Sequence, residues 1–186
     1  LAIHGGLIGG LVVAYIFTKI KKINFFEYID VIMPGVILAQ AIGRWGNFMN
    51  QEAHGGPVSQ EFISKFPQFI QDGMLINGTY YHPTFLYESL WNLVGLTIIL
   101  VSRAKNKFHR IGDGICFYLI WYGLGRACII EPLRMDPLLF IDSVGPDVLF
   151  NRVNVVINLL LALAGITWLV LKHTKIKDPF YIETKK

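Results

Sequence analysis

The stretch VIMPGVILAQAIGRWGNFMNQEAHG, residues 31–55, changes character halfway along its length. Its first twelve residues are almost all apolar, whereas the next thirteen include an arginine, two asparagines, a glutamate and a histidine. Charge is costly inside the hydrocarbon of a bilayer and is usually kept there for a task or a partner. This pattern therefore predicts a membrane-spanning helix that ends in a functional site.

The composition of the whole chain supports a membrane protein. Of its 186 residues, 53% are hydrophobic and only 16% are charged, against about a quarter charged in soluble domains. A helix needs roughly 20 apolar residues to cross the bilayer. Five blocks approach or reach that length, at residues 4–20, 28–45, 85–101, 114–130 and 153–171. We predict an all-α polytopic transmembrane bundle of about five spans, forming one catalytic domain over residues 1–186.

The two ends of the chain and its cysteines add little to this prediction. The sequence opens on LAIHGG without a methionine, so we expect a fragment that lacks its N-terminal part. No basic segment precedes the first block, which disfavours a signal peptide. Cys116 and Cys128 lie in one predicted helix, about 18 Å apart at 1.5 Å per residue. They are too distant for a disulfide and are interpreted as packing residues.

Basic residues predict the topology. Most of them follow the first, third and fifth spans: Lys19, Lys21, Lys22, Arg103, Lys105, Lys107, Arg110, Lys172, Lys175, Lys177, Lys185 and Lys186. The positive-inside rule places these ends, including a basic tail at 172–186, in the cytoplasm. The net charge of +4 then reflects topology and anionic lipid, and requires no nucleic acid. The long connection 51–81 is predicted to form an extracytoplasmic arm.

Polar residues of several segments should gather near the outer leaflet. Arg44 and Arg126 occupy or end apolar spans, and Arg134 belongs to an outer loop. His4, His82, Tyr87 and Glu88 fall at the outer ends of other spans. The alternative for His4, Gly5 and Gly6 is a structural hydrogen bond next to a glycine face that packs helices.

Individual side chains suit the binding of an anion. Arg44 offers a fixed fork of donors for a phosphate. Asn47 and Asn50 would share a face if the helix continued, and Glu52 could pair with an arginine or hold it in position. The alternative is a helix-end salt bridge with asparagine caps. Tyr122 and Arg126 are four apart and share a helix face. Glu88 is expected to accept a hydrogen bond or salt bridge within the bundle, and Tyr87 to anchor the interface.

The motif G-R-W-G-N-F-M-N-Q-E-A-H-G resembles, at every fixed position, the signature of the bacterial prolipoprotein diacylglyceryl transferases. AIHGGLIGG, HPTFLYE and YGLGR followed by E-x-x-R-x-D resemble further stretches of that family in the same order. The resemblance implies a bacterial inner-membrane protein of about seven spans, so two would be missing here. It implies transfer of diacylglyceryl from phosphatidylglycerol to the lipobox cysteine of a preprolipoprotein, which forms a thioether and releases glycerol phosphate.

The resemblance also implies a set of site residues. Arg44, Asn47, Asn50, Glu52 and Gly55 match the signature, and His4 matches the family's essential histidine. Tyr122 and Arg126 match the tyrosine and arginine of the late helix. The family usually has a glutamate four residues after that arginine, whereas Glu131 is five residues after it. We expect a π-bulge near 128–130 to return Glu131 to Arg126, since such bulges absorb one extra residue; the alternative is a loop anchor for Arg134.

The expected chemistry agrees with these residue types. Charge that develops on a phosphate oxygen would be stabilised by preorganised arginines, and His4 is the candidate base for a thiol whose ordinary pKa is about 8.5. No cofactor is expected, and the five histidines lack the spacing of metal ligands. Two alternatives remain: a transporter for an anionic solute, with Pro34 and Gly35 interrupting its second span, and a noncatalytic phospholipid-binding scaffold, whose arginines would tolerate lysine.

Overall fold

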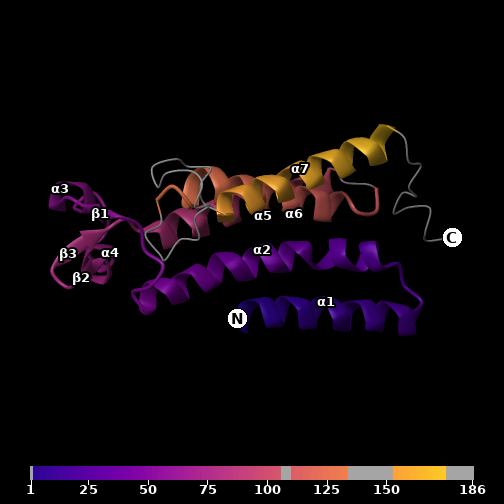
Figure 1. Cartoon of the computed structure of the whole chain (residues 1–186), viewed down its shortest axis with the longest axis horizontal. Coiled ribbons are helices and arrows are strands. Elements are labelled where there is room, and N and C mark those ends of the chain that lie inside the picture. Colours follow the sequence, from indigo (N-terminus) through magenta and orange to yellow (C-terminus); the bar gives the residue numbers. More distant parts are fainter. Residues whose placement is uncertain (1, 106–109, 134–152, 175–186) are drawn as a thin grey trace.

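The computed structural model describes residues 2–105, 110–133 and 153–174, with side chains from Gly9 onward. Long helices dominate this part of the chain (Figure 1). They are α1 Ala2–Lys21, α2 Phe25–Met49, α5 Thr84–Ala104, α6 Asp113–Leu124 and α7 Val153–Thr174. Helix α6 continues directly into a short π-helix, η1 Gly125–Ile130. Four segments have the length and apolar composition of membrane spans: Phe25–Met49, Thr84–Ala104, Asp113–Ile130 and Val153–Thr174. The chain is a polytopic helical membrane protein, and its first predicted span coincides with α1.

Helix α2 is longer than the apolar block that predicted it. Its start is set by Asn24, whose side chain accepts hydrogen bonds from the backbone N–H groups of Phe26 and Glu27 at 2.9 and 3.4 Å. The helix then runs through Pro34 without a break. The expected interruption at Pro34 and Gly35 is therefore wrong. Membrane helices tolerate proline because neighbouring groups satisfy the backbone that it frees.

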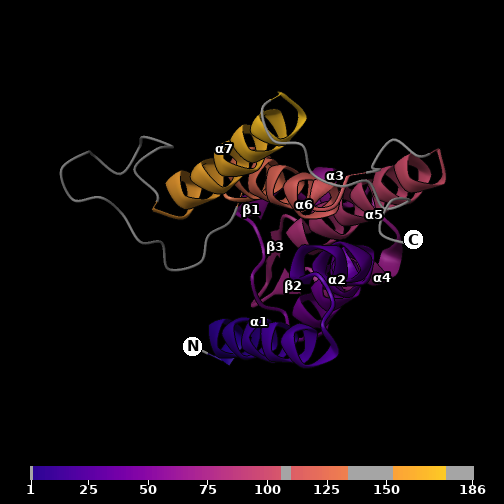
Figure 2. The ribbon, with the colours of Figure 1, turned by 90° about the vertical axis from the view of Figure 1, so that its right-hand side faces the viewer.

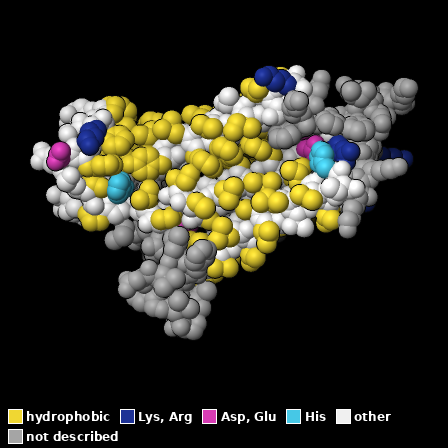
Figure 3. Space-filling view, turned by 90° about the horizontal axis from the view of Figure 1, so that it is seen from above, with side chains coloured by type: hydrophobic (Ala, Val, Ile, Leu, Met, Phe, Trp, Pro, Cys, Tyr) yellow, Lys and Arg dark blue, Asp and Glu magenta, His cyan; other side chains and the backbone are white. Residues whose placement is uncertain are grey.

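The bundle has an apolar interior and an apolar exterior. Ile29, Met33 and Ile37 of α2 form a buried cluster with Ile99 of α5 and Ala14 of α1. Large apolar side chains also cover the middle of the face in Figure 3, whereas most charged side chains gather toward its two ends. Such a belt of exposed apolar side chains suits lipid, because a water-soluble surface rarely exposes so large an apolar patch.

The connection predicted as an arm folds into a small unit at one end of the bundle (Figure 1). Strands β1 Pro57–Val58, β2 Leu75–Ile76 and β3 Thr79–Tyr81 pair antiparallel in the order β1-β3-β2. Helices α3 Gln60–Ile63 and α4 Gln68–Gly73 precede β2. The arm's core consists of Ile63, Ile70 and Met74 packed with Phe85 of α5, so the arm is fastened to the third span.

A second polar cluster lies at the opposite end of the bundle. Asp30 is fully buried in α2 and accepts a hydrogen bond from the backbone N–H of Ile115 at 2.8 Å and another from Gly112. Lys172 is 2% exposed and donates to the carbonyl of Ile111. Helix α7 continues to Thr174 and buries this lysine, so the first three residues of the segment predicted as a basic tail are helical. Residues 175–186 lie outside the described residues.

Candidate active site

Glu88 of α5 joins two arginines that come from different helices. Its Oε2 lies 2.5 Å from Nε of Arg44 in α2, and its Oε1 lies 2.6 Å from Nη1 of Arg126 in η1. The side chains of Arg44, Glu88 and Arg126 are 25%, 7% and 14% exposed. The salt bridge expected for Glu88 is thus confirmed, and one buried carboxylate brings the two arginines to the same place.

The π-helix predicted from the shifted spacing is confirmed. Residues Gly125–Ile130 form η1, and the backbone N–H of Glu131 donates to the carbonyl of Arg126, five residues back, at 2.9 Å. This widened turn brings the Glu131 carboxylate, 2% exposed, into an ion pair with Nη2 of Arg126. The guanidinium of Arg126 is therefore held between Glu88 and Glu131.

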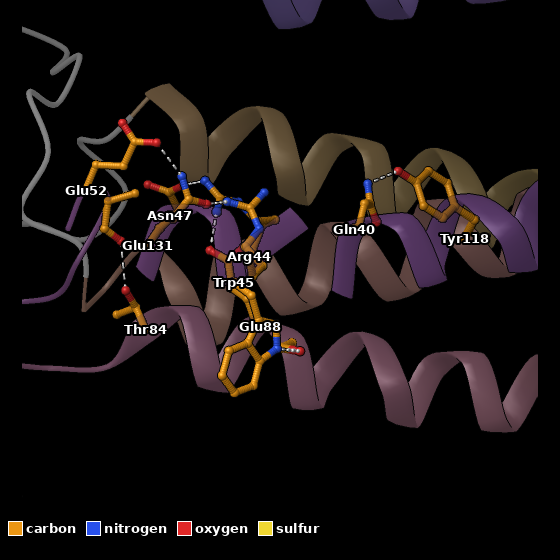
Figure 4. A network of polar contacts seen from close by, with 12 residues as sticks. Gln40, Arg44, Trp45, Asn47, Glu52, Thr84, Glu88, Tyr118 and Glu131 are labelled. Carbon is orange, nitrogen blue, oxygen red and sulfur yellow. Dashed lines mark hydrogen bonds and ion pairs between the residues drawn. The ribbon is translucent and has the colours of Figure 1, made fainter. Parts of the chain in front are cut away.

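The signature residues after Arg44 form a relay of hydrogen bonds (Figure 4). Nη1 of Arg44 donates to Oδ1 of Asn47 at 3.2 Å, and Nδ2 of Asn47 donates to Oε1 of Glu52 at 3.0 Å. Asn50 donates to the same oxygen at 3.3 Å. Helix α2 ends at Met49, so Asn50 meets Asn47 through Glu52 and not along a continued helix face. Glu52 holds Arg44 indirectly, through Asn47.

Gly55 is packed against backbone and leaves no room for a side chain. A Cβ at this position would lie 2.5 Å from Cβ of His82 and 2.8 Å from the carbonyl oxygen of Leu133. The N–H of Gly55 donates to the carbonyl of His82, and the N–H of Gly56 donates to that of Leu133, both at 3.0 Å. These contacts tie the loop that carries Glu52 to the end of η1, so Gly55 has a structural reason to be glycine.

One cavity lies between α2, α5, α6 and η1. It is lined by Gln40, Arg44, Glu88, Trp91, Asn92, Tyr122, Gly125, Arg126 and Ile130, and it holds about 270 Å³ of empty space, part of which is open to the outside. The arginines of both motifs thus face one cavity. Nε of Arg126 and Oε1 of Gln40 are buried there without a hydrogen-bond partner in the described part of the chain.

Trp91 lines the cavity between α5 and α6 and is backed by Trp121. The rings of Trp91 and Trp121 stack at 4.1 Å between centroids, and each indole N–H donates to the other's backbone carbonyl at 3.1 Å. Gly95 and Gly125 leave the space for the rings. A Cβ at Gly125 would lie 2.1 Å from Nε1 of Trp91, and one at Gly95 would lie 2.3 Å from Nε1 of Trp121.

The remaining predicted site residues are not on this cavity or are not described. Nδ1 of His82 lies 3.4 Å from the Tyr87 hydroxyl, and neither residue lines the cavity. Burial lowers the pKa of His82 from its ordinary 6.5, which favours the neutral ring. The side chain of His4, the surroundings of Gly5 and Gly6 and the whole of Arg134 lie outside what the structure describes. Within the described ranges, no group of histidine, cysteine and carboxylate side chains could hold a metal ion.

Several residues of the cavity were missed by the sequence analysis. Gln40 precedes Arg44 by four residues, and Nε2 of its amide donates to the Tyr118 hydroxyl at 2.7 Å. Asn92 follows Glu88 by four residues and is 8% exposed. A polar residue inside an apolar span, one helical turn from a residue already selected, is the signal that could have found both.

Comparison with known proteins connects this geometry to a family. Residues 1–171 match the family described as prolipoprotein diacylglyceryl transferase. Curated relatives named phosphatidylglycerol–prolipoprotein diacylglyceryl transferase include one from Clostridium botulinum (strain Loch Maree / Type A3), 53% identical over 86% of this chain and 61% of that protein. Another, from Staphylococcus xylosus, is 46% identical over 97% of this chain and 62% of that protein. The chain therefore spans about three fifths of these relatives' length.

Proposed function

The chain belongs to the prolipoprotein diacylglyceryl transferase family, and from this membership we propose the activity of the whole protein. It transfers the diacylglyceryl group of phosphatidylglycerol to the thiol of the lipobox cysteine of a preprolipoprotein. A thioether forms and glycerol phosphate leaves. The observation that supports this proposal most strongly is the convergence of Arg44 and Arg126, through Glu88, on one cavity.

In this reaction the arginines act on the phosphate. The thiolate sulfur forms a bond to the terminal glycerol carbon of the diacylglyceryl group, and the bond from that carbon to the phosphate oxygen breaks. The electron pair of the broken bond moves to that oxygen, where negative charge develops. Guanidinium groups fixed in advance, in a site of low dielectric, stabilise such charge without reorganisation.

The two arginines have different parts in this proposal. Arg126 is engaged by two carboxylates and is the more buried, so it is held as a fixed positive charge. Arg44 is more exposed, and its known contacts use only its Nε and Nη1 atoms. Since a guanidinium carries five N–H donors, Arg44 retains donors for an incoming phosphate. We assign Arg44 the main phosphate contact and Arg126 the supporting field.

Other groups have more limited roles. Asn47, Asn50 and Glu52 orient Arg44 through their hydrogen-bond relay. His4 is the proposed base that takes the thiol proton, and Gly5 and Gly6 would let substrate approach the backbone of α1. Tyr122 lines the cavity one turn before Arg126 and is a candidate for direct substrate contact.

The proposed location is the bacterial plasma membrane, with the cavity toward the outer leaflet and the C-terminus in the cytoplasm. The lysine-rich turn between α1 and α2 and the ends of α5 and α7 lie at one end of the bundle, away from the arm (Figure 1). The positive-inside rule then assigns that end to the cytoplasm. A transporter is disfavoured, because α2 is continuous and the charged groups of the cavity lie toward the arm.

Mass spectrometry of a lipobox peptide tests the proposal. The purified full-length protein is incubated with the peptide and phosphatidylglycerol vesicles, and a diacylglyceryl adduct on the cysteine is expected. The Arg44→Ala variant should yield no adduct, whereas Lys105→Met, an exposed residue at the opposite end of α5, should yield the wild-type amount. Absence of the adduct with the wild-type protein would overturn the proposed activity.

A further inference from the structure

The cavity has two layers of polar side chains. Arg44, Glu88 and Arg126 form the layer toward the arm, each on a different helical segment. Each has a neutral polar residue four positions away that lines the same cavity: Gln40, Asn92 and Tyr122. Helices α2 and α6 run toward the arm and α5 runs away from it (Figure 1), so all three neutral residues lie on the side away from the arm. Figure 4 shows this for Gln40 relative to Arg44.

The spacing of the layers follows from helix geometry. Four residues of helix correspond to about 6 Å along the axis. That distance is comparable to the length of a phosphoglycerol group. A ligand that places its phosphate between the arginines would therefore bring a second polar group level with Gln40 and Asn92.

The neutral layer has hydrogen-bonding capacity to spare. Gln40 uses its Nε2 on Tyr118, while its Oε1 is buried without a partner. Asn92 and Tyr122 make no side-chain hydrogen bond to another described residue. A buried amide oxygen without a partner costs free energy, so it marks a position where a donor is expected to bind.

The chemistry of the layer selects an uncharged ligand. Amide and phenol groups both donate and accept, which matches hydroxyl groups that do the same. The cavity opens to the outside, and Trp91, Gly125 and Ile130 complete its wall. Gln40, Asn92 and Tyr122 contain no charge that would favour an ammonium headgroup.

We propose that Gln40 and Asn92, together with Tyr122, form a subsite that binds the hydroxyl groups of the phospholipid headgroup. The inference rests on the proposed function and adds to it the residues that select a glycerol headgroup. The phosphate binds at the arginines and the glycerol extends toward Gln40 and Asn92. These residues touch the part of the lipid that leaves, so they determine which phospholipid is used.

The test compares two lipids that share the phosphate and acyl chains. Phosphatidylglycerol has two headgroup hydroxyls, and phosphatidylpropanol has none. Binding of each lipid to the purified full-length protein is measured by native mass spectrometry, and transfer to a lipobox peptide is measured in parallel. The wild-type protein should prefer phosphatidylglycerol. Gln40→Leu and Asn92→Leu should each reduce that preference about tenfold, the loss expected for one hydrogen bond to a buried group.

Controls separate the possible failures. Thr97→Val removes an exposed hydroxyl from α5 that bonds only to the carbonyl of Leu93, and it should leave the preference unchanged. Gln40→Asn, which retains an amide, covers the case in which Gln40→Leu does not fold. Equal weakening of both lipids, or an unchanged ratio in the leucine variants, would overturn the subsite. A wild-type protein that binds the lipids with the expected ratio but transfers nothing would overturn the proposed activity alone.

Discussion

Arg126 and Glu131 are five residues apart in the sequence and form an ion pair, because the helix between them is widened into a π-turn. In an α-helix the fifth residue points about 140° away. The π-turn accommodates the one residue by which this spacing exceeds the usual spacing of the family. The guanidinium of Arg126 therefore pairs with Glu131 as well as with Glu88.

Deletion of Cys128 tests this relationship. The shortened segment should form a regular α-helix in which arginine and glutamate are four apart and share a face. Transfer of diacylglyceryl to a lipobox peptide should remain within a few-fold of wild type. Deletion of Ile120 from the regular helix α6 is the control, since it should turn Arg126 by about 100° and abolish transfer. Loss of transfer on deletion of Cys128 would mean that the π-turn itself is required.

Glu88→Gln should separate the two arginines. The amide cannot neutralise two guanidinium groups, so Arg44 and Arg126 would repel each other beside the cavity. We expect transfer to fall about 100-fold or more and the free energy of unfolding to fall by about 3 kcal/mol. Adduct formation and thermal unfolding in detergent measure these effects. Glu61→Gln, on the exposed surface of the arm, is the matched control and should change neither.

Arg44→Lys should behave almost as a loss of function. A lysine ammonium cannot replace the planar fork that contacts both Glu88 and Asn47. Transfer should fall about 100-fold with little change in thermal stability. A noncatalytic scaffold that needs only positive charge would instead bind phosphatidylglycerol equally well with lysine.

Gly125→Ala should displace Trp91 from the cavity wall. The new Cβ would meet Nε1 of Trp91 at 2.1 Å, and overpacking of this kind costs about 1–3 kcal/mol. Both the midpoint of thermal unfolding and the rate of transfer should fall. Gly35→Ala, at a position with no heavy atom within 4 Å of the added Cβ, should leave both unchanged.

The stability of the protein should depend on pH through His82. Burial holds its pKa below the ordinary 6.5, so protonation costs more in the folded state than in the unfolded state. Stability is complete above about pH 6.5 and decreases as the pH falls toward the lowered pKa. Thermal unfolding at pH 7.5 and 5 should show a smaller decrease for His82→Gln than for wild type. An identical decrease in the two proteins would contradict this assignment.

The positions of the spans could be predicted from the sequence, but their ends could not. Apolar blocks located each long helix within a few residues. Helix α2 extends three residues before its block, from the cap at Asn24, and four residues beyond it, to Met49. A helix can continue into polar sequence as long as its backbone hydrogen bonds are formed. Hydropathy therefore locates the apolar part of a helix but not its ends.

The charged residues of the site were predictable, whereas Gln40, Asn92 and the internal structure of the arm were not. Arginine in an apolar span is conspicuous, and the shifted position of Glu131 indicated the π-turn. Gln40 and Trp121 resemble ordinary interior or interface residues until their partners are known. The arm's strands are only two or three residues long, too short for an alternating pattern.

The reciprocal bonds between Trp91 and Trp121 also restrict how α5 and α6 can slide past each other. A shift by a single residue would break both bonds together and move each indole away from the glycine that leaves room for it. The hydrocarbon of the bilayer contains no donors or acceptors that could replace the two lost hydrogen bonds, so such a shift is unfavourable. The two helices, which lie beside each other in Figure 2, therefore have one discrete register, and a lipid that enters must do so without changing it.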